Sequence, residues 1–188
     1  KGDVLNREKL EEFRKGLEEH YHSVGRYNAK VETIVNPLPN NRAEVKIQVT
    51  ENDVALLKDI TFVGNQAFDS DRLQDQMELQ PDAWWKFFGN KFDSTQFTKD
   101  LETIRNYYLD RGYAKAGIAN TDVKLNDEKT EARVTIDIVE GEKYTVNSAR
   151  IVGDVGGMAE QLSPLLKQIH VGEEFRRSDV QLVEESIK

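Results

Sequence analysis

The feature that most constrains this sequence is a segment that occurs twice. YHSVGRYNAK at 21–30 returns as YLDRGYAKA at 108–116, and the glycines of the two segments, Gly25 and Gly112, lie 87 positions apart. A fixed internal period indicates that a chain is built from copies of one supersecondary unit. Any fold proposed for this chain must therefore repeat with that spacing.

Other markers recur in the same order. GDVL at 2–5 matches GNKF at 89–92, and GEEF at 172–175 is a third version. ITFVGN at 60–65 resembles ARIVGD at 149–154 with an offset of 89. Two independent sets of markers agree on the period, so chance recurrence of glycine and apolar residues is the weaker explanation.

The period sets the domain boundaries that we expect. Residues 1–53 form the later part of one copy, residues 54–141 a complete copy, and residues 142–188 the early part of another. The sequence opens with KGDVLNREKL, which has neither an initiator Met nor a charged-then-apolar signal. We therefore interpret it as an internal piece of a longer protein.

Charge and composition exclude several classes of function. The net charge is −8, and Lys and Arg are interspersed with Asp and Glu, whereas nucleic-acid binding relies on clustered cations. Cysteine is absent, which removes disulfides, thiolate metal sites and cysteine nucleophiles. No apolar run approaches the roughly 18 residues of a membrane helix. We expect no nucleic-acid partner.

The complete copy predicts a strand, two helices and two strands. Asp69 or Ser70 can cap a short helix that carries Leu73 and Met77 at i, i+4. Asp93 and Ser94 can cap a second helix that ends at Gly112. The apolar residues on one face of that helix are Phe97, Leu101, Ile104 and Tyr108. The strands are expected within 56–65, 114–125 and 131–140.

The last strand alternates strictly, which predicts one buried and one solvated face. Its apolar residues are Ala132, Val134, Ile136 and Ile138. The first copy repeats the pattern, with the same burial expected, at Ala43, Val45, Ile47 and Val49. The last two strands form a hairpin, and placing the last strand in the middle lets both neighbours run antiparallel to it. Both outer strands are then edges.

The strand before the hairpin turn carries an irregularity. Ala116 and Ile118 are apolar at even positions, but Val123 and Leu125 are apolar at odd ones. A β-bulge between them would restore the inward face. A strand that simply starts after Asn120 would explain the pattern equally well.

These units resemble POTRA domains, through YxxxGYA-type ends of the second helix and a Gly-Asn after the first strand. More narrowly, DLETIRNYYLDRGYAKAGI at 100–118, WWKFFGNKF at 84–92 and YHSVGRYNAKVETIVNPLPNNRAEV at 21–45 are similar to the BamA family of outer-membrane protein assembly factors of Gram-negative bacteria. The likeness runs from the second POTRA domain through the third into the fourth. It implies an α+β fold of tandem βααββ repeats, each a three-stranded mixed sheet with two helices on one face.

The resemblance also implies a function. It implies a periplasmic location, a C-terminal β-barrel beyond this sequence, and partners among BamB, other Bam lipoproteins, unfolded outer-membrane proteins and periplasmic chaperones. The family's BamB-docking strand also carries a bulge. The matching residues here are Lys115, Ala116, Gly117, Ile118, Ala119, Asn120, Thr121, Asp122, Val123 and Lys124. An exposed edge can template another strand through its backbone.

Rival functions have weaker support. A KH-like RNA-binding array needs a basic GxxG between its helices, where this chain has GNKF. A hydrolase using His20 and His22 lacks a catalytic constellation, and positions i, i+2 on a helix cannot share a metal. A related outer-membrane exporter, or the TamA type of translocation protein, remains the nearest alternative. We expect no enzyme, metal or cofactor.

Three further features receive structural interpretations. His20, His22 and His170 are expected on the surface. The glycines of VGDVGGMAE at 152–160 are expected to form a turn, because the loop lacks a phosphate-binding motif. The aromatic cluster Trp84, Trp85, Phe87 and Phe88 is expected to pack between the two helices, with a partly exposed contact to a neighbouring domain or partner as the alternative.

Overall fold

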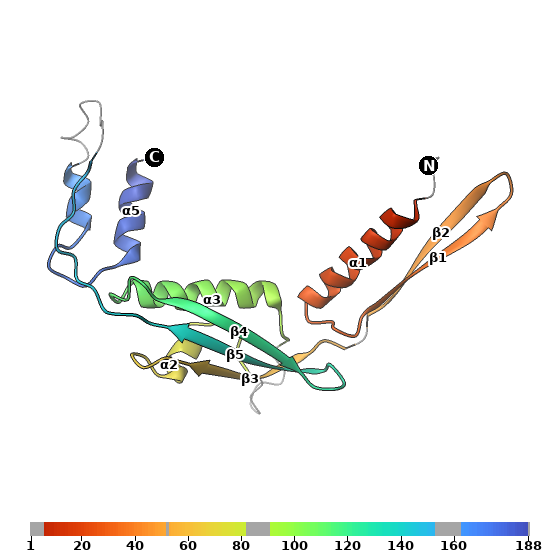
Figure 1. The fold of residues 1–188 in the computed structure, drawn as a ribbon, viewed down its shortest axis with the longest axis horizontal. Helices are drawn as coiled ribbons and strands as arrows, with labels where there is room; N and C mark the ends of the chain where they lie inside the picture. Colours follow the sequence, from red (N-terminus) through yellow and green to blue (C-terminus); the bar gives the residue numbers. More distant parts are fainter. Residues whose placement is uncertain (1–5, 52, 82–90, 153–162, 188) are drawn as a thin grey trace. The chain divides into compact units, whose positions relative to one another are not determined.

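The computed structural model describes residues 6–51, 53–81, 91–152 and 163–187. The aromatic residues at 84–88, which were predicted to pack between two helices, lie outside these ranges. So do the three glycines at 153–157, which were predicted to form a turn. The elements follow the predicted repeat (Figure 1). They are α1 (Arg7–Ser23), β1 (Lys30–Leu38), β2 (Arg42–Thr50), β3 (Leu56–Val63), α2 (Ser70–Gln74), α3 (Ser94–Leu109), β4 (Gly117–Leu125), β5 (Glu131–Val139), η1 (Ser163–Gln168) and α5 (Arg177–Ile187).

The central sheet has the order β3-β5-β4, so the predicted middle position of the last strand is confirmed. The expectation that both neighbours run antiparallel to it is wrong. Leu56 N–H bonds Thr130 O at the start of β3, while Gly64 lies against Ile138 at its end, so β3 and β5 are parallel. The mixed sheet implied by the family resemblance is the observed one.

The direction of β3 follows from the path of the chain after it. By Lys91 the chain is back beside the start of the strand, where Lys91 bridges Leu56 and Phe92 N–H donates to Ala55 O at 2.8 Å. Helix α3 therefore begins at the end where β3 began. The Asp93 carboxylate caps it by accepting from the N–H groups of Thr95 and Gln96.

The core of the complete copy is built from the predicted faces. On β5 the alternate apolar residues are buried while Arg133 and Val139 are exposed. The Asp69 side chain caps α2 through the Arg72 N–H. Gly112 ends α3 with a positive φ of 90°. The most completely buried core side chains are Leu57, Leu73, Phe92, Ile104, Tyr108, Val134 and Ile136.

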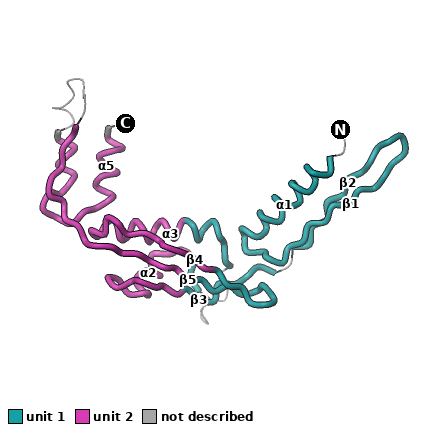
Figure 2. Tube along the Cα trace, in the orientation of Figure 1, with its two compact units in different colours: residues 1–60, 79–98, 123–134 teal, residues 61–78, 99–122, 135–188 magenta. Residues whose placement is uncertain are grey.

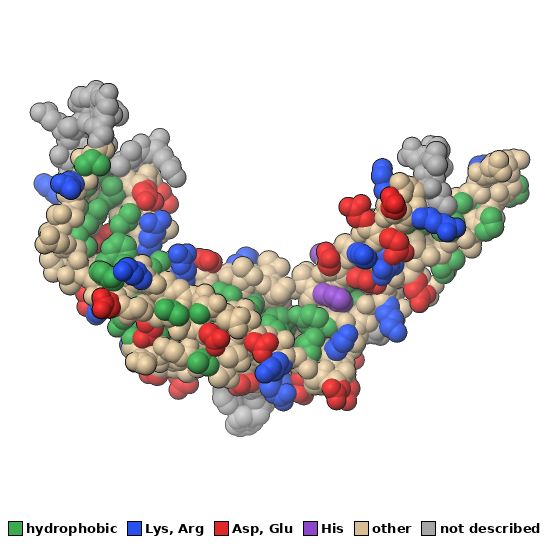
Figure 3. Space-filling view, viewed as in Figure 1, with side chains coloured by type: hydrophobic (Ala, Val, Ile, Leu, Met, Phe, Trp, Pro, Cys, Tyr) green, Lys and Arg blue, Asp and Glu red, His purple; other side chains and the backbone are tan. Residues whose placement is uncertain are grey.

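The first hairpin forms as predicted, but its face is not buried. β1 and β2 pair antiparallel from Lys30↔Thr50 to Leu38↔Arg42. Val45 and Ile47 are nevertheless 36% and 40% exposed, and Ala43 is also exposed. The burial predicted for the first copy is therefore wrong. Helix α1 packs on β1 of this hairpin, and apolar side chains of the hairpin remain visible on the surface (Figure 3).

The chain divides into two compact units that cut across the repeat (Figure 2). One unit comprises residues 1–60, 79–98 and 123–134, and the other residues 61–78, 99–122 and 135–188. In the second unit, the segment after β5 is joined to residues 172–175 by backbone hydrogen bonds and by an isolated bridge, Thr145↔Glu174. Residues 149–152, which belong to the repeat marker ARIVGD, are not assigned to a strand.

Candidate functional site

The predicted partner-binding segment lies on an outer strand of the central sheet. Strand β4 spans Gly117–Leu125 and has one neighbour, β5. Lys115 and Ala116 precede the strand, and the Ala116 side chain is buried, so these two residues do not belong to the exposed edge. The other predicted residues, 117–124, all lie within β4.

The turn between β4 and β5 is held by one side chain. Asn126 Oδ1 accepts from the N–H groups of Thr130 and Glu131 at 2.8 and 2.9 Å. Lys129 takes a φ of 53° and its N–H donates to Asn126 O. An asparagine side chain that substitutes for backbone acceptors fixes a turn locally. The hairpin is therefore rigid at this end without help from a partner.

The exposure of β4 supports a bulge near its start. The strand begins at Gly117, which rules out the alternative that it starts after Asn120. Ala119 and Asn120 are both exposed, whereas Thr121, Val123 and Leu125 alternate with exposed neighbours. Two successive exposed residues inside a strand are what an extra residue in one strand produces.

The register shows which amides face outward. Asn126 N–H donates to Glu131 O at 3.1 Å, and the Asn120 side-chain amide reaches Asp137 on the opposite strand at 3.4 Å. Successive N–H groups of a strand point to opposite sides. The N–H groups of Thr121, Val123 and Leu125 therefore point away from β5. Within the described part of the chain, these three N–H groups donate to no atom outside the sheet.

The opposite edge of the sheet is less available. The outer side of β3 is bridged at Leu56 by Lys91, and the adjacent Ala55 both donates to Gly25 O and accepts from Phe92 N–H. Main-chain groups that are already paired cannot template another strand. Of the two outer strands, β4 is therefore the better candidate for strand addition.

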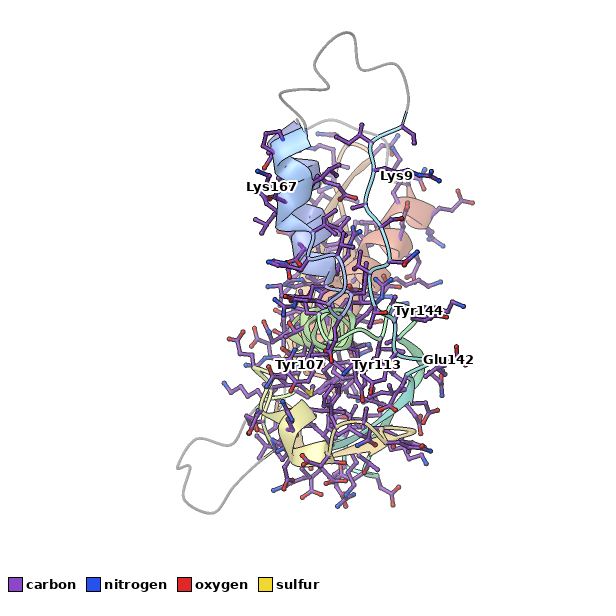
Figure 4. The ribbon with its side chains drawn as sticks, turned by 90° about the vertical axis from the view of Figure 1, so that its left-hand side faces the viewer. Lys9, Tyr107, Tyr113, Glu142, Tyr144 and Lys167 are labelled. Atoms are coloured by element: carbon purple, nitrogen blue, oxygen red, sulfur yellow. The ribbon has the colours of Figure 1, made fainter. Side chains whose placement is uncertain are left out.

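The N-terminal end of β4 is tied to the following segment. The Lys115 ammonium lies 5.3 Å from the Tyr144 ring centroid, and a hydrogen bond to the Tyr144 side chain raises the pKa of Lys115. Tyr144 N–H donates to Gly112 O at 2.7 Å. Tyr113 and Tyr144 are labelled in Figure 4. Lys115 is therefore engaged within the chain.

Sequence reasoning missed a hydrogen bond that recurs with the repeat. The Tyr108 hydroxyl donates to Glu140 at 2.9 Å, and the Tyr21 hydroxyl donates to Glu51 at 3.1 Å. Tyr108 is fully buried, and burial followed by the bond to Glu140 raises its pKa strongly. Both partners recur at the repeat offsets of 87 and 89, so this signal was present in the sequence.

The Glu140 carboxylate also organises the loop after β3. It accepts from the N–H groups of Gln66 and Ala67 at 2.8 and 2.9 Å. The same carboxylate therefore joins the end of β5, the end of α3 and the loop that leaves β3. Glu51 has no such loop to hold among the described residues.

The histidines and the possible metal ligands can be placed within the described ranges. They contain no group of three His, Asp or Glu side chains that could hold a metal ion. His20 is exposed, whereas His22 is half-buried with its ring 5.8 Å from that of Tyr27, so the surface prediction fails for His22. His170 is exposed and lies 3.0 Å from Asp179. No helix in the described ranges is both long enough and apolar enough to cross a membrane.

Comparison with known proteins identifies the family. The POTRA family, described as a surface antigen variable number repeat, matches residues 1–52 and 55–141. The outer membrane protein assembly factor BamA of Neisseria meningitidis serogroup B is 28% identical over 181 residues, which are 95% of this chain and 23% of that protein. BamA of Buchnera aphidicola is 23% identical over 171 residues, 90% of this chain and 28% of that protein. The chain thus spans about a quarter of these curated relatives.

A solved structure shows the same relationship. The crystal structure of Haemophilus influenzae BamA POTRA3-5 is 57% identical, covers 71% of this chain and 53% of its own, and superposes with a TM-score of 0.64. The tandem βααββ arrangement, the family match and this superposition agree. The chain belongs to the POTRA family, and it is a POTRA region of the BamA type.

Proposed function

We propose that this chain is the periplasmic scaffold and substrate-binding region of an outer-membrane protein assembly factor. In this assignment residues 1–53 belong to the second POTRA domain, 54–141 form the third, and 142–188 begin the fourth. The 57% identity to a POTRA3-5 structure and the names of the BamA relatives support it. This support favours a BamA-type assembly factor over a related exporter or a TamA-type protein.

The proposed mechanism is strand addition along the outer edge of β4. The single observation that carries it is the row of outward N–H groups at Thr121, Val123 and Leu125 on a strand with one neighbour. A partner strand bound there is read through its backbone, with little dependence on side-chain sequence. Such a mode suits unfolded outer-membrane proteins, which share alternating strands and no single motif.

The expected strength limits what the edge does alone. About five added backbone hydrogen bonds at 0.5–1.5 kcal/mol each contribute roughly 2.5–7.5 kcal/mol. Association costs about 4–15 kcal/mol. Edge pairing by itself is therefore weak and transient, as a chaperone-like step requires. A stable partner such as BamB, or another Bam lipoprotein, needs side-chain contacts in addition to the backbone hydrogen bonds. Unfolded clients and periplasmic chaperones, which bind transiently, do not need such side-chain contacts.

The test uses two substitutions at one position. Val123→Pro removes an outward N–H while leaving the inward amides of β4 to pair with β5. Val123→Ala removes most of the side chain and keeps the N–H. With folding verified by amide NMR, we expect Val123→Pro to weaken cognate BamB binding about tenfold, as loss of roughly 1.4 kcal/mol would. Val123→Ala should weaken it less.

Two results would count against the proposal. Equal losses for the two variants would mean that the side chain, not the backbone, is recognised. Unchanged BamB binding by folded Val123→Pro would mean that this edge is not the docking strand. The role proposed here is binding and scaffolding without catalysis.

A further inference from the structure

Two arginines flank one tyrosine ring in the complete copy, on the second compact unit. The guanidinium carbon of Arg111 lies 3.5 Å from the Tyr107 ring centroid, and that of Arg72 lies 5.7 Å from the same point. Arg72 is also 5.2 Å from the Phe68 ring centroid. Both distances are measured to the same ring centroid, so the two guanidinium carbons can be no farther apart than these two distances laid end to end. We call Arg72, Arg111 and Tyr107 the arginine shelf.

The side chains of the shelf are held in place before any ligand arrives. Arg72 Nε donates to the Tyr107 hydroxyl. Arg111 Nη1 donates to Tyr107 O at 2.9 Å, which satisfies a carbonyl in the last turn of α3. Tyr107 itself is only 8% exposed, and its ring packs edge-on against Phe68. Arginines fixed in this way lose little conformational entropy on binding.

Among the described residues, neither arginine has a carboxylate partner. Within the described ranges, no Asp or Glu oxygen lies within 4.0 Å of a nitrogen of Arg72 or Arg111. Cations that do have a carboxylate partner are Arg14, Arg26, Lys58, Arg105, Arg133, Lys143, Arg176 and Arg177.

Three carboxylates of the same compact unit, those of Asp69, Asp110 and Glu140, are engaged elsewhere. Asp69 caps α2 through the Arg72 backbone N–H. Asp110 accepts from the N–H of Ser178 at 2.8 Å, and Glu140 is held by Gln66, Ala67 and Tyr108. Each guanidinium carries five N–H donors, of which the hydrogen bonds to Tyr107 use one apiece. Toward the described part of the chain, most of the hydrogen-bonding capacity of the shelf is therefore unused.

We propose that the arginine shelf binds a carboxylate side chain of an acidic protein segment, as a second contact surface separate from the β4 edge. Guanidinium groups match carboxylates in planar, paired hydrogen bonds. Arginine and tyrosine together are typical of residues that dominate protein–protein binding. The Asp69 cap of α2 and the negative net charge disfavour a densely charged lipid or phosphate surface more strongly than a protein segment that offers one carboxylate to the shelf.

The experiment titrates the protein with a defined probe and follows the arginine side-chain Nε–Hε signals by NMR. The probe is a blocked peptide carrying two adjacent glutamates, with its diglutamine counterpart as the control ligand. We expect saturable shifts of the Arg72 and Arg111 signals with the glutamate peptide only. Arg72→Gln should weaken binding about tenfold, the effect of losing one charge-assisted pair.

A matched variant and a competing ligand complete the design. Arg105→Gln lies on the same helix as Tyr107 but removes an arginine already paired with Glu102, so it should leave binding unchanged. Arg72→Gln spares the helix-capping bond of Arg111, so loss of folding does not confuse the result. Equal weakening by both variants, or no saturable shift, would overturn the proposal. Tighter binding of inorganic phosphate or phosphatidylglycerol vesicles to the same signals would overturn the carboxylate assignment.

Discussion

Replacing Tyr108 with Phe tests why a Tyr–Glu hydrogen bond recurs with the repeat. Tyr108 is 0% exposed, and its hydroxyl donates to Glu140 at 2.9 Å. A buried hydrogen bond to a charged group contributes about 1.5–3 kcal/mol. Glu140 keeps its two backbone donors from Gln66 and Ala67, so no unpaired charge is left behind. We therefore expect Tyr108→Phe to lower the free energy of unfolding by about 1.5–3 kcal/mol.

The first copy supplies a matched control. Tyr21 makes the equivalent bond to Glu51 at 3.1 Å, but this bond is exposed to water, which replaces a lost hydroxyl readily. Tyr21→Phe should therefore have a much smaller effect. The assay is urea unfolding followed by amide NMR, with the signals of β4–β5 and of β1–β2 fitted separately. Equal losses for the two variants, or none for Tyr108→Phe, would refute the reasoning.

Three further outcomes follow from the same structure. Gly25→Ala should lower the free energy of unfolding by about 2 kcal/mol or more, because Gly25 has a φ of 81° and an added Cβ would lie 2.2 Å from a backbone oxygen. Gly16→Ala, in a helix and with open space around the added Cβ, should be neutral or stabilising. Urea unfolding measures both. Ile136→Ala should cost about 2–5 kcal/mol and half-exposed Ile47→Ala far less, which the same assay measures. Because burial raises the pKa of Tyr108 above its ordinary value of 10.0, its contribution is complete below that pH and is lost as pH rises further, so wild-type stability should fall more steeply than that of Tyr108→Phe.

Most of the complete copy was predictable because its signals are local. The caps at Asp69 and Asp93, the left-handed Gly112 and the alternation on β5 each depend on residues close in sequence. The sheet order followed from connectivity. The direction of β3 could not be predicted in this way, because it depends on the return of the chain to Leu56 from distant residues. No local sequence pattern indicates that return.

Burial in the first copy was mispredicted for a related reason. Alternation shows which face of a strand is apolar, but burial also requires another element to cover that face. Val45 and Ile47 alternate as Val134 and Ile136 do, yet remain exposed, because α1 packs mainly on β1. A repeated pattern thus predicts the strand more securely than its environment.

The candidate site, too, could be predicted from the sequence only in part. The edge position of residues 117–124 could be predicted from the hairpin and the strand order. Which amides face outward could not, because that depends on the register set by Asn126 and Glu131. The arginine shelf gave no sequence signal, because Arg72 on α2 reaches Tyr107 only through the packing of separate helices.

Amide hydrogen exchange along β4, measured with and without cognate BamB, tests the account most directly. Strand addition predicts that binding slows exchange at Thr121, Val123 and Leu125, whose N–H groups point away from β5. Residues 122 and 124, which point inward, should change little. Slowing confined to α2 or α3, or slowing without a period of two along β4, would contradict backbone pairing at this edge.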